Sequence, residues 1–306
     1  MSDLIFYFAG DSGRPSVEEE IEENNYPKLQ SYVNDMKSIR RRIDKGLKTF
    51  IDSGAFSAHT KGVEIDVDKY IDWLNYYDDY VTIAAQIDTI PGKYGEAKTK
   101  EDVKFAAEES WRNYLYMRER LDNPDKLLPV FHQGEDFKFL KQMFLKQMLD
   151  YRPKIDYIGV SPTNDLPVKN KIMWLEYVFD IIRKSGNPNV KTHGFGFTSP
   201  QGLKRFNFTS VDSASWIMTA ASGSIHSHWG TLLVSEVSKN KPNHVTNRFN
   251  TEGLQELCNY IESRGFTLEE LATNHVRRFS WNLHYVLEMV ENLDMERCKS
   301  KQTYLW

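Results

Sequence analysis

The chain contains 306 residues, which is enough for one large domain or two small ones. Apolar residues make up 40% and charged residues 27% of the composition, which excludes a disordered chain or a fibre. The formal net charge of −4 argues against a histone-like nucleic-acid binder but is compatible with a local basic groove. Two cysteines, Cys258 and Cys298, are too few for a disulfide scaffold or for a zinc site with three or four thiolates.

No stretch of the sequence approaches the ~18 apolar residues of a transmembrane helix. The first residues contain no basic segment followed by a cleavage site, so they do not resemble a secretion signal. We therefore expect no membrane contact and a cytoplasmic location.

Short apolar runs alternate with longer helical patterns along the chain. The runs are continuous and rich in β-branched or aromatic residues, as buried parallel strands are. They are Leu4–Phe8, Thr49–Asp52, Val81–Asp88, Leu127–Gln133, Tyr157–Ser161, Val190–Phe197, Phe208–Ala214 and Gly230–Ser235. About eight strands separated by helices favour a closed (β/α)8 barrel of the TIM type over an open sheet.

Amphipathic segments between the runs predict the helices of this α/β fold. They are Tyr70–Tyr77, Lys100–Leu121, Phe137–Tyr151 and Lys169–Lys184. The second of these follows Thr99, a residue type that caps helix starts. From Thr251 onward the pattern is purely helical. We expect the barrel to occupy residues 1–240 and a C-terminal helical cap, residues 241–306, to pack on it within the same domain.

Polar residues and glycines gather where the predicted strands end. In a barrel these carboxyl ends share one rim, and barrel enzymes keep their active sites there. Asp52 ends the second run and Asp88 the third, while Asp212 lies in the seventh. An Asp after a strand is often the N-cap of the next helix, and Asp212 has the strongest such claim because residues 213–221 look helical.

Two carboxylates in one site point to nucleophilic or acid/base chemistry. An ionised Asp212 could attack an electrophilic carbon such as an anomeric centre, while Asp52 moves the proton of the leaving or incoming group. This is the logic of a retaining glycosyl transfer. These residues alone do not separate N-glycosidic from O-glycosidic chemistry.

Several of these segments resemble those of tRNA-guanine transglycosylases, in the same order. Residues 50–56 (FIDSGAF) are similar to the Asp-Ser-Gly-Gly-Phe-Gln segment of that family, and residues 210–216 (SVDSASW) to its nucleophile segment. Between them lie counterparts of the base-recognising Asp (86–88, QID), the Val-Gln-Gly segment (130–134, VFHQG), the glycine of the fifth strand (158–160, IGV) and the Gly-x-Gly turn (194–200, GFGFTSP). The resemblance covers residues 45–235.

The resemblance implies a role for each matched position. Asp212 would displace guanine and form a covalent link to C1′ of the sugar, and Asp52 would be the general acid/base. Asp88 would accept hydrogen bonds from the base, while Gln133 and the N–H of Gly159 would address its O6 side. The expected substrate-binding residues are Ser53, Gly54, Asp88, Gln133, Gly134, Gly159, Gly194, Phe195 and Gly196. Phe195 or Phe197 would stack on the base or enclose it.

The sequence also departs from the tRNA-modifying relatives. It lacks their Cys-x-Cys-x-x-Cys and the following His, so we expect no metal and no cofactor. It also ends at Trp306, where the archaeal proteins continue into an RNA-binding domain. This pattern resembles the DpdA-type enzymes of phages and bacterial modification islands, which exchange guanine in DNA for a 7-deazaguanine base. Because the relatives dimerise partly through the zinc region, its loss favours a monomer. A phage-encoded protein would act in the host cytoplasm.

The resemblance therefore predicts DNA and a free 7-deazaguanine base, such as 7-cyano-7-deazaguanine, as partners. The expected DNA-contacting residues are Lys204, Arg205, Arg277 and Arg278. Alternatives are a zinc-free tRNA-guanine transglycosylase, a barrel that binds guanine or nucleic acid without catalysis, and a barrel that processes small glycosides or nucleosides.

Overall fold

The computed structural model describes residues 4–93, 95–149, 155–163 and 166–303. The chain divides into two compact units, one made of Met1–Gly10 and Asn25–Ser213 and the other of Asp11–Asn24 and Ala214–Trp306. The second unit thus begins earlier in the chain than residue 241, where we expected the helical cap to start.

Parallel strands form the sheet of the first unit. Among the described residues this sheet has nine strands, in the order β5-β4-β3-β2-β1-β9-β8-β7-β6. They are β1 (Ile5–Ala9), β2 (Lys28–Ser31), β3 (Thr49–Asp52), β4 (Val81–Ala85), β5 (Leu127–Leu128), β6 (Val130–His132), β7 (Tyr157–Ser161), β8 (Lys191–Gly194) and β9 (Ser210–Ser213).

The two edge strands of this sheet, β5 and β6, are halves of one strand separated by Pro129. The first half pairs with β4 and the second with β7, all in parallel. Proline has no N–H to donate, so it marks the point at which the strand changes partners. Its carbonyl accepts the N–H of Gly159, and the carbonyl of Leu128 accepts the N–H of Gln86. The strand therefore joins both ends of the sheet, which confirms the predicted eight-stranded barrel.

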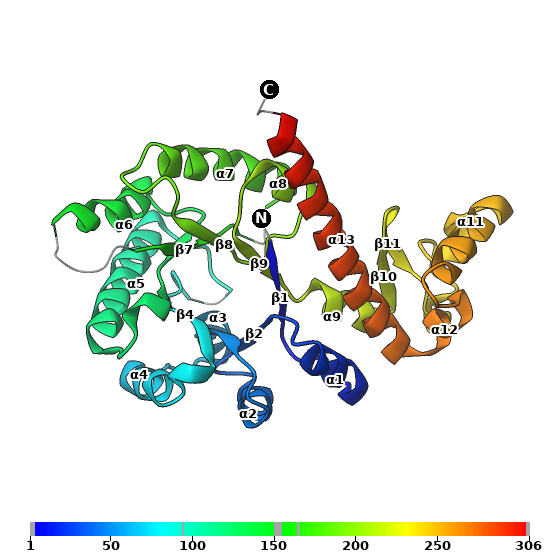
Figure 1. The fold of residues 1–306 in the computed structure, drawn as a ribbon, viewed down its shortest axis with the longest axis horizontal. Coiled ribbons are helices and arrows are strands. Elements are labelled where there is room, and N and C mark those ends of the chain that lie inside the picture. Colours follow the sequence, from blue (N-terminus) through cyan, green and yellow to red (C-terminus); the bar gives the residue numbers. More distant parts are fainter. Residues whose placement is uncertain (1–3, 94, 150–154, 164–165, 304–306) are drawn as a thin grey trace. The chain divides into compact units, whose positions relative to one another are not determined.

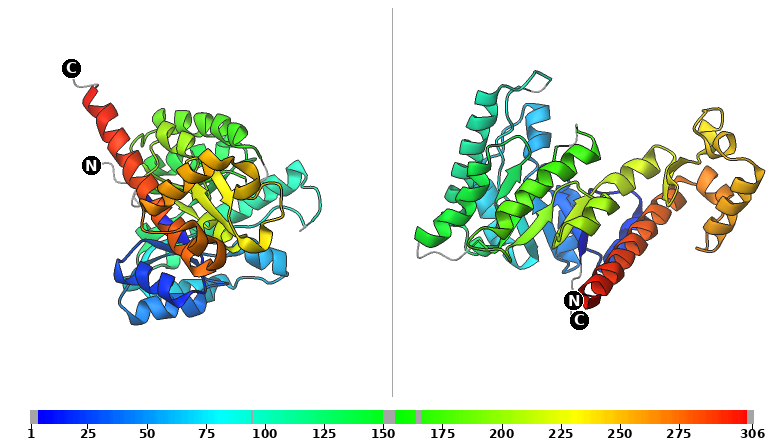
Figure 2. Two further views of the ribbon diagram at one scale, coloured as in Figure 1. Left: turned by 90° about the vertical axis from the view of Figure 1, so that its right-hand side faces the viewer. Right: turned by 90° about the horizontal axis from the view of Figure 1, so that it is seen from above.

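Helices follow the strands and surround them (Figure 1). Those of the first unit are α2 (Met36–Asp44), α3 (Ala55–Lys61), α4 (Val67–Tyr76), α5 (Lys100–Arg120), α6 (Phe137–Leu149), α7 (Val168–Arg183) and α8 (Pro200–Arg205), with short 3₁₀ turns at Asp78–Tyr80 and Pro124–Lys126. Thr99 caps α5 as predicted, because its side chain accepts the N–H of Asp102. Neighbouring helices pack in pairs, α4 against α5 and α6 against α7 (Figure 2).

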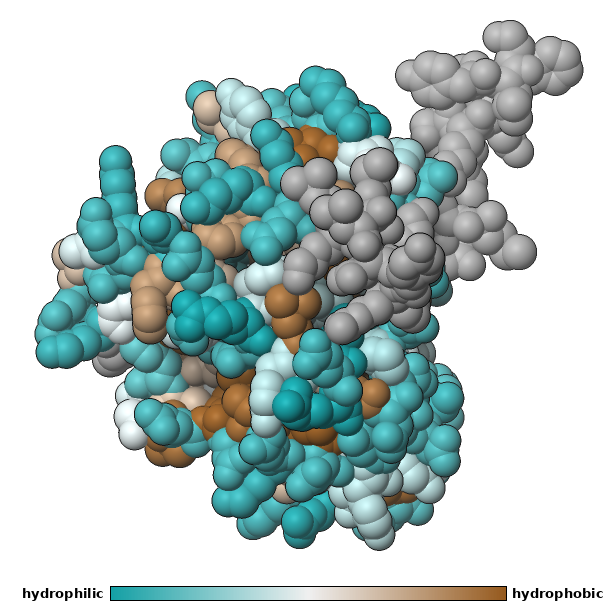
Figure 3. Space-filling model, turned by 90° about the vertical axis from the view of Figure 1, so that its left-hand side faces the viewer, coloured by the Kyte–Doolittle hydropathy of each residue, from teal (hydrophilic) through white to brown (hydrophobic). Residues whose placement is uncertain are grey.

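One face of the molecule is mainly hydrophilic. Figure 3 shows one face of the molecule, on which apolar residues lie singly or in small groups within a polar surface. Among the described residues, no helix is long and apolar enough to cross a membrane.

Aromatic side chains meet inside the barrel. The rings of Phe50 on β3 and His193 on β8 lie 4.7 Å apart, and that of Tyr7 on β1 lies 5.2 Å from Phe50. No two of these three strands are adjacent in the sheet, so their side chains reach each other only across the interior. Residues two positions further along the same strands point the same way. This periodicity brings Asp52, which follows Phe50 by two, to the carboxyl rim of the interior.

Two strands differ from the sequence prediction. The barrel contains β2, which no apolar run indicated because Lys28 and Gln30, on the same side of the strand, are polar although both are fully buried. The run 230–235 was predicted as a barrel strand, which is wrong. Its strand β11 (Gly230–Leu233) instead pairs antiparallel with β10 (Ser224–Ser227) in a two-stranded hairpin of the second unit.

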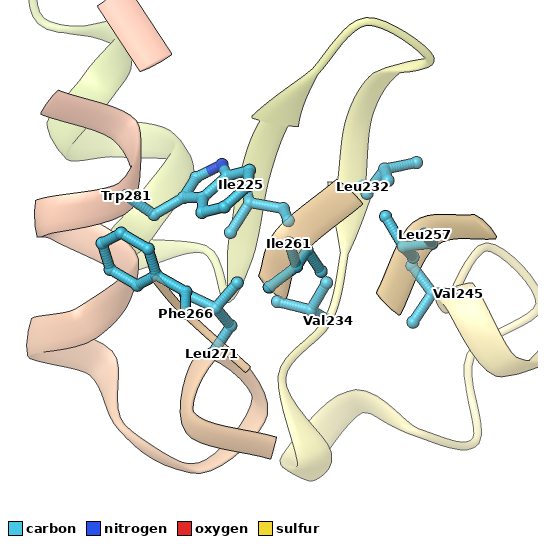
Figure 4. Close-up of a cluster of buried hydrophobic side chains, with 9 residues drawn as sticks. All are labelled: Ile225, Leu232, Val234, Val245, Leu257, Ile261, Phe266, Leu271 and Trp281. Atoms are coloured by element: carbon cyan, nitrogen blue, oxygen red, sulfur yellow. The ribbon is translucent and has the colours of Figure 1, made fainter. Parts of the chain in front are cut away.

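The second unit has a core of its own. Its helices are α1 (Pro15–Glu23), α9 (Ser215–Ala221), α10 (Val245–Arg248), α11 (Thr251–Glu262), α12 (Leu268–Thr273) and α13 (His275–Thr303), with a 3₁₀ turn at Glu236–Ser238. The helical pattern predicted from Thr251 onward is thus confirmed. Side chains from the hairpin and from α10–α13 form a buried cluster (Figure 4), which comprises Ile225, Leu232, Val234, Val245, Leu257, Ile261, Phe266, Leu271 and Trp281. Asn282 on α13 ties the hairpin in place by accepting the N–H of His226.

Candidate active site

Asp52 is the last residue of β3, and the turn that follows holds its side chain. Gly54 lies in the left-handed region at φ 79°, and its N–H donates to Oδ2 of Asp52 over 3.1 Å. A Cβ at this glycine would come within 2.5 Å of the hydroxyl of Ser31 and 2.8 Å of Cβ of Val33. The turn therefore requires glycine both for its conformation and for space. Ser53 is buried beside it.

Asp212 lies on β9 and is nearly enclosed, with an 11% exposed side chain. Its Oδ1 accepts two hydrogen bonds, from Nε2 of His193 at 3.2 Å and from the N–H of Gly196 at 3.0 Å. The helix that follows begins with Ala214 as its N-cap and has no side-chain cap. The capping role considered for Asp212 is therefore absent, and its carboxylate is directed to the barrel interior instead.

His193 continues this set of contacts into the barrel. The side chain is completely buried, and its Nδ1 lies 2.6 Å from the hydroxyl of Ser210. The same hydroxyl lies 2.5 Å from the phenol oxygen of Tyr157, at the start of β7. Burial raises the pKa of Tyr157 far above its ordinary value, so this phenol keeps its proton. A connected row of polar groups thus extends from Tyr157 to the carboxylate of Asp212.

Asp88, beyond the end of β4, belongs to a second polar cluster. Its Oδ1 accepts the amide of Gln86 at 2.6 Å, and its Oδ2 lies 3.2 Å from Nε2 of His132. The other ring nitrogen of His132 lies 3.1 Å from Glu135. Burial acts to lower the pKa of His132, but Asp88 and Glu135 outweigh it and raise the pKa well above its ordinary value. This arrangement favours the protonated form of His132, which pairs with both carboxylates.

The charges of the other two aspartates act on Asp52. Burial raises the pKa of Asp52 to about 7, with further upward contributions from the charges of Asp212 and Asp88. The hydrogen bond from Gly54 acts in the opposite direction but does not cancel this effect. A carboxyl group with this pKa can both give and take a proton near neutral pH, as a general acid/base must.

An aromatic ring borders this group of carboxylates. Phe195, just beyond β8, is partly exposed, and its ring lies 4.5 Å from that of His193 and 6.0 Å from that of Phe50. Gly159 on β7 makes room for it, since a Cβ there would lie 2.6 Å from the ring. Phe197, the alternative stacking residue, is only 2% exposed and packs near Phe208, so Phe195 is the better placed of the two.

The remaining predicted substrate-binding residues differ in their surroundings. The side-chain oxygen of Gln133 accepts the N–H of Thr163 at 3.2 Å, which holds the amide beside the end of β7. Gly134 is exposed and Gly194 is buried. The N–H of Gly159, which the resemblance assigns to O6 of the base, donates to the carbonyl of Pro129 at 2.8 Å. That N–H is thus part of the sheet and does not fit the expected contact with a base.

The predicted basic residues lie apart from the aspartates or serve the fold. Lys204 and Arg205 form the last turn of α8, on the way back to the start of β9, and Arg205 pairs with Glu176. A helix that returns in this way carries its end from the rim toward the amino ends of the strands. Lys204 and Arg205 therefore do not lie next to the aspartates, which does not fit their predicted contact with DNA at this site.

The two arginines of the second unit are already engaged within it. Arg277 bonds the carbonyl of Gly265 and pairs with Glu270. Arg278 is 7% exposed, and its guanidinium donates to the carbonyls of Leu271, Ala272 and Ala220. The burial of Arg278 does not fit the predicted contact with a phosphate, because its donors are used to hold helices of its own unit together.

Sequence reasoning did not include His193, Ser210, Tyr157 or Glu135 among the site residues. The signal for His193 was present, since it lies two positions before Phe195, on the same side of its strand. The link to Ser210 depends on the pairing of β8 with β9, in which these two residues are partners. Such a register is a property of the assembled sheet and is not visible in one strand's sequence.

No group of three or more His, Cys, Asp or Glu side chains that could hold a metal ion occurs among the described residues. No protein-family model matches the sequence, and no curated protein matches it at a significant level.

Proposed function

We propose that the protein is a transglycosylase that replaces guanine in DNA by a 7-deazaguanine base, such as 7-cyano-7-deazaguanine. The observation that carries this proposal is the difference between two neighbouring carboxyl groups. Asp52 has a pKa of about 7, whereas Asp212 accepts two N–H donors on one oxygen. Such pairs of carboxyl groups with different surroundings perform acid/base and nucleophilic roles in glycosyl transfer.

In the first half-reaction Asp212 attacks C1′ of the target nucleotide. The C1′–O bond forms as the bond from C1′ to the guanine nitrogen breaks, and the electron pair stays on guanine. Asp52 delivers its proton to a ring nitrogen of the leaving base. In the second half-reaction the incoming base gives a proton to Asp52 and attacks C1′, which releases the carboxylate of Asp212. Atoms and charge balance, and Asp52 returns to its starting state.

The other groups fit the binding of a base. Asp88 can accept N–H donors of a guanine-like ring, and Phe195 offers an aromatic face, which is typically worth about 1–3 kcal/mol per stacked base. A nucleotide in duplex DNA must leave the stack to reach such a site, at a cost of a few kcal/mol. DNA is chosen over tRNA because the sequence lacks the zinc-binding cysteines of the tRNA-modifying relatives.

The test is incorporation of labelled guanine, or of 7-cyano-7-deazaguanine detected by mass analysis of nucleosides, into DNA and into tRNA. We expect incorporation into DNA with the wild-type protein. Asp212→Ala should show neither incorporation nor a covalent adduct. Incorporation into tRNA alone would support the tRNA enzyme, and binding of guanine without exchange would support a non-catalytic barrel. Exchange on free nucleosides that is unaffected by salt would indicate a small-molecule enzyme.

A further inference from the structure

His193 is the only histidine that contacts Asp212 among the described residues, and it has no contact with solvent. Both of its ring nitrogens have partners, Ser210 at Nδ1 and Asp212 at Nε2. Its ring is enclosed by the aromatic rings of Tyr7, Phe50 and Phe195. The ring therefore cannot turn without losing a hydrogen bond in an apolar environment, where an unpaired polar atom is costly.

The partners determine which way the hydrogen bonds are directed. A carboxylate only accepts, so Nε2 of His193 carries a proton and donates it to Asp212. Tyr157 keeps its proton because burial raises its pKa far above the ordinary value. The phenol can then donate to Ser210, and the hydroxyl of Ser210 can donate to Nδ1 of His193. One continuous direction of donation, from Tyr157 to Asp212, satisfies every member of the row.

The two oxygens of Asp212 are not equivalent. Oδ1 receives both donors, the Nε2–H of His193 and the N–H of Gly196. Among the described residues, no hydrogen bond to Oδ2 is formed. The donors thus hold the plane of the carboxylate and leave one oxygen available to a reacting carbon.

We propose that His193 is a positioning residue that fixes Oδ1 of Asp212 and leaves Oδ2 as the attacking oxygen, with Ser210 and Tyr157 holding its ring and tautomer. This inference rests on the proposed glycosyl transfer. The donors also act differently on the two half-reactions. They stabilise the free carboxylate, so they assist its departure from C1′ in the second half-reaction and moderate its nucleophilicity in the first.

Replacement of His193 by a ring without donors tests this role. In His193→Phe we expect kcat for base exchange to fall about tenfold to a hundredfold, the range of one hydrogen bond to a charged group, with little change in KM. The fraction of enzyme trapped as covalent adduct at steady state should rise, because departure of Asp212 slows more than attack. His193→Gln, which can present an amide donor, should recover part of kcat. A role in packing alone would lower thermal stability without raising the adduct fraction.

Two milder variants test the role even if His193→Phe does not fold. Ser210→Ala and Tyr157→Phe remove one hydroxyl each and keep the shape of the interior. We expect the loss of kcat to grow from Tyr157→Phe to Ser210→Ala, in step with the distance from Asp212. The matched control is His244→Phe. His244 is a buried histidine of the second unit that bonds Thr246, and its replacement should leave exchange unchanged.

Nitrogen-15 NMR of the imidazole ring tests the geometry without any activity assay. We expect a proton on Nε2 of His193 in the wild type, and a changed Nε2 signal in Asp212→Asn. A ring without a proton on Nε2, or wild-type exchange in folded His193→Phe or in both Ser210→Ala and Tyr157→Phe, would overturn the proposal. If the NMR result is as expected but the wild type exchanges no base in DNA or tRNA, the proposed function fails while the hydrogen-bond assignment stands.

Discussion

Asp52 and Asp212 have the same side chain, but the barrel gives them different surroundings. Asp52 receives one backbone N–H, whereas Asp212 receives a backbone N–H and a histidine N–H on the same oxygen. Burial and the neighbouring negative charges raise the pKa of Asp52 to about 7. These environments determine which residue is suited to hold a proton and which to attack.

The rate of guanine release should depend on pH through Asp52. In the proposed reaction the leaving base takes its proton from this residue. The first half-reaction then needs the protonated form, and release should slow as pH rises through about 7. Single-turnover release of labelled guanine from DNA, followed between about pH 5 and 9, measures this. Asp52→Asn should abolish release at every pH. A wild-type rate that is flat across the range would remove Asp52 from this role.

The same group makes the folded protein less stable at high pH. Between about pH 4 and 7 the folded state holds a proton on Asp52 that the unfolded chain has lost, so the free energy of unfolding falls as pH rises. Asp52→Asn removes this dependence. Above pH 7 the variant should be more stable than the wild type, on the order of 2–4 kcal/mol in chemical denaturation. Asp72→Asn, at an exposed position of α4, should keep the wild-type pH dependence. A lower stability of Asp52→Asn at high pH would contradict the expectation.

At the scale of strands and helices, sequence patterns predicted those elements whose burial depends on apolar side chains. Seven of the predicted runs overlap barrel strands, and the capped start of α5 was visible at Thr99. The strand β2 was missed because two of its three buried positions are filled by Lys28 and Gln30, which give no apolar signal. The strand β11 was found but given the wrong neighbours, since an apolar run indicates a strand without specifying its partner.

The turn after β3 is the element that most directly shapes the site. Gly54→Ala should destabilise the protein by about 2–4 kcal/mol, because it adds left-handed strain of about 1–2 kcal/mol to a clash with Cβ of Val33. It should also lower exchange, since the N–H of this turn holds Asp52. Thermal or chemical denaturation and the exchange assay measure the two effects.

Gly62→Ala is the matched control for this prediction. Gly62 also has a positive φ, at 64°, but a Cβ there meets nothing within 4 Å. The control should show only the cost of the strained backbone, about 1–2 kcal/mol, and keep exchange. Equal losses of stability in the two variants would show that the close approach at Gly54 does not matter.

At the scale of the whole chain, composition limited the possibilities and motif order supplied the functional hypothesis. The alignment of Asp52, Asp88 and Asp212 on one rim follows from parallel strands and could be expected from the sequence. The positions of the basic residues could not, because Lys204 and Arg205 are neighbours of the Gly-x-Gly turn in sequence but lie at the far end of a returning helix. Proximity along the chain is a poor guide to proximity in a barrel, where each connection crosses the whole length of a strand.

For the proposed DNA-modifying function, the topology predicts that lysines at helix starts of the first unit contact the DNA backbone. Lys169 and Lys171 lie in the first turn of α7, next to the rim, whereas Arg183 and Lys184 lie at its other end. With a net charge of −4, affinity for DNA must come from a local surface and should weaken as salt rises.

The double variant Lys169→Gln with Lys171→Gln should weaken DNA binding. It should also lower the slope of log affinity against log salt by about 2, one for each phosphate that the variant no longer neutralises. Arg183→Gln with Lys184→Gln removes the same charge from the same helix at the opposite end of the barrel, so it should leave both quantities near the wild-type values. Titrations by fluorescence anisotropy at several salt concentrations measure both quantities. Equal effects of the two double variants would mean that the total charge, and not the position of the lysines at the rim, determines the affinity.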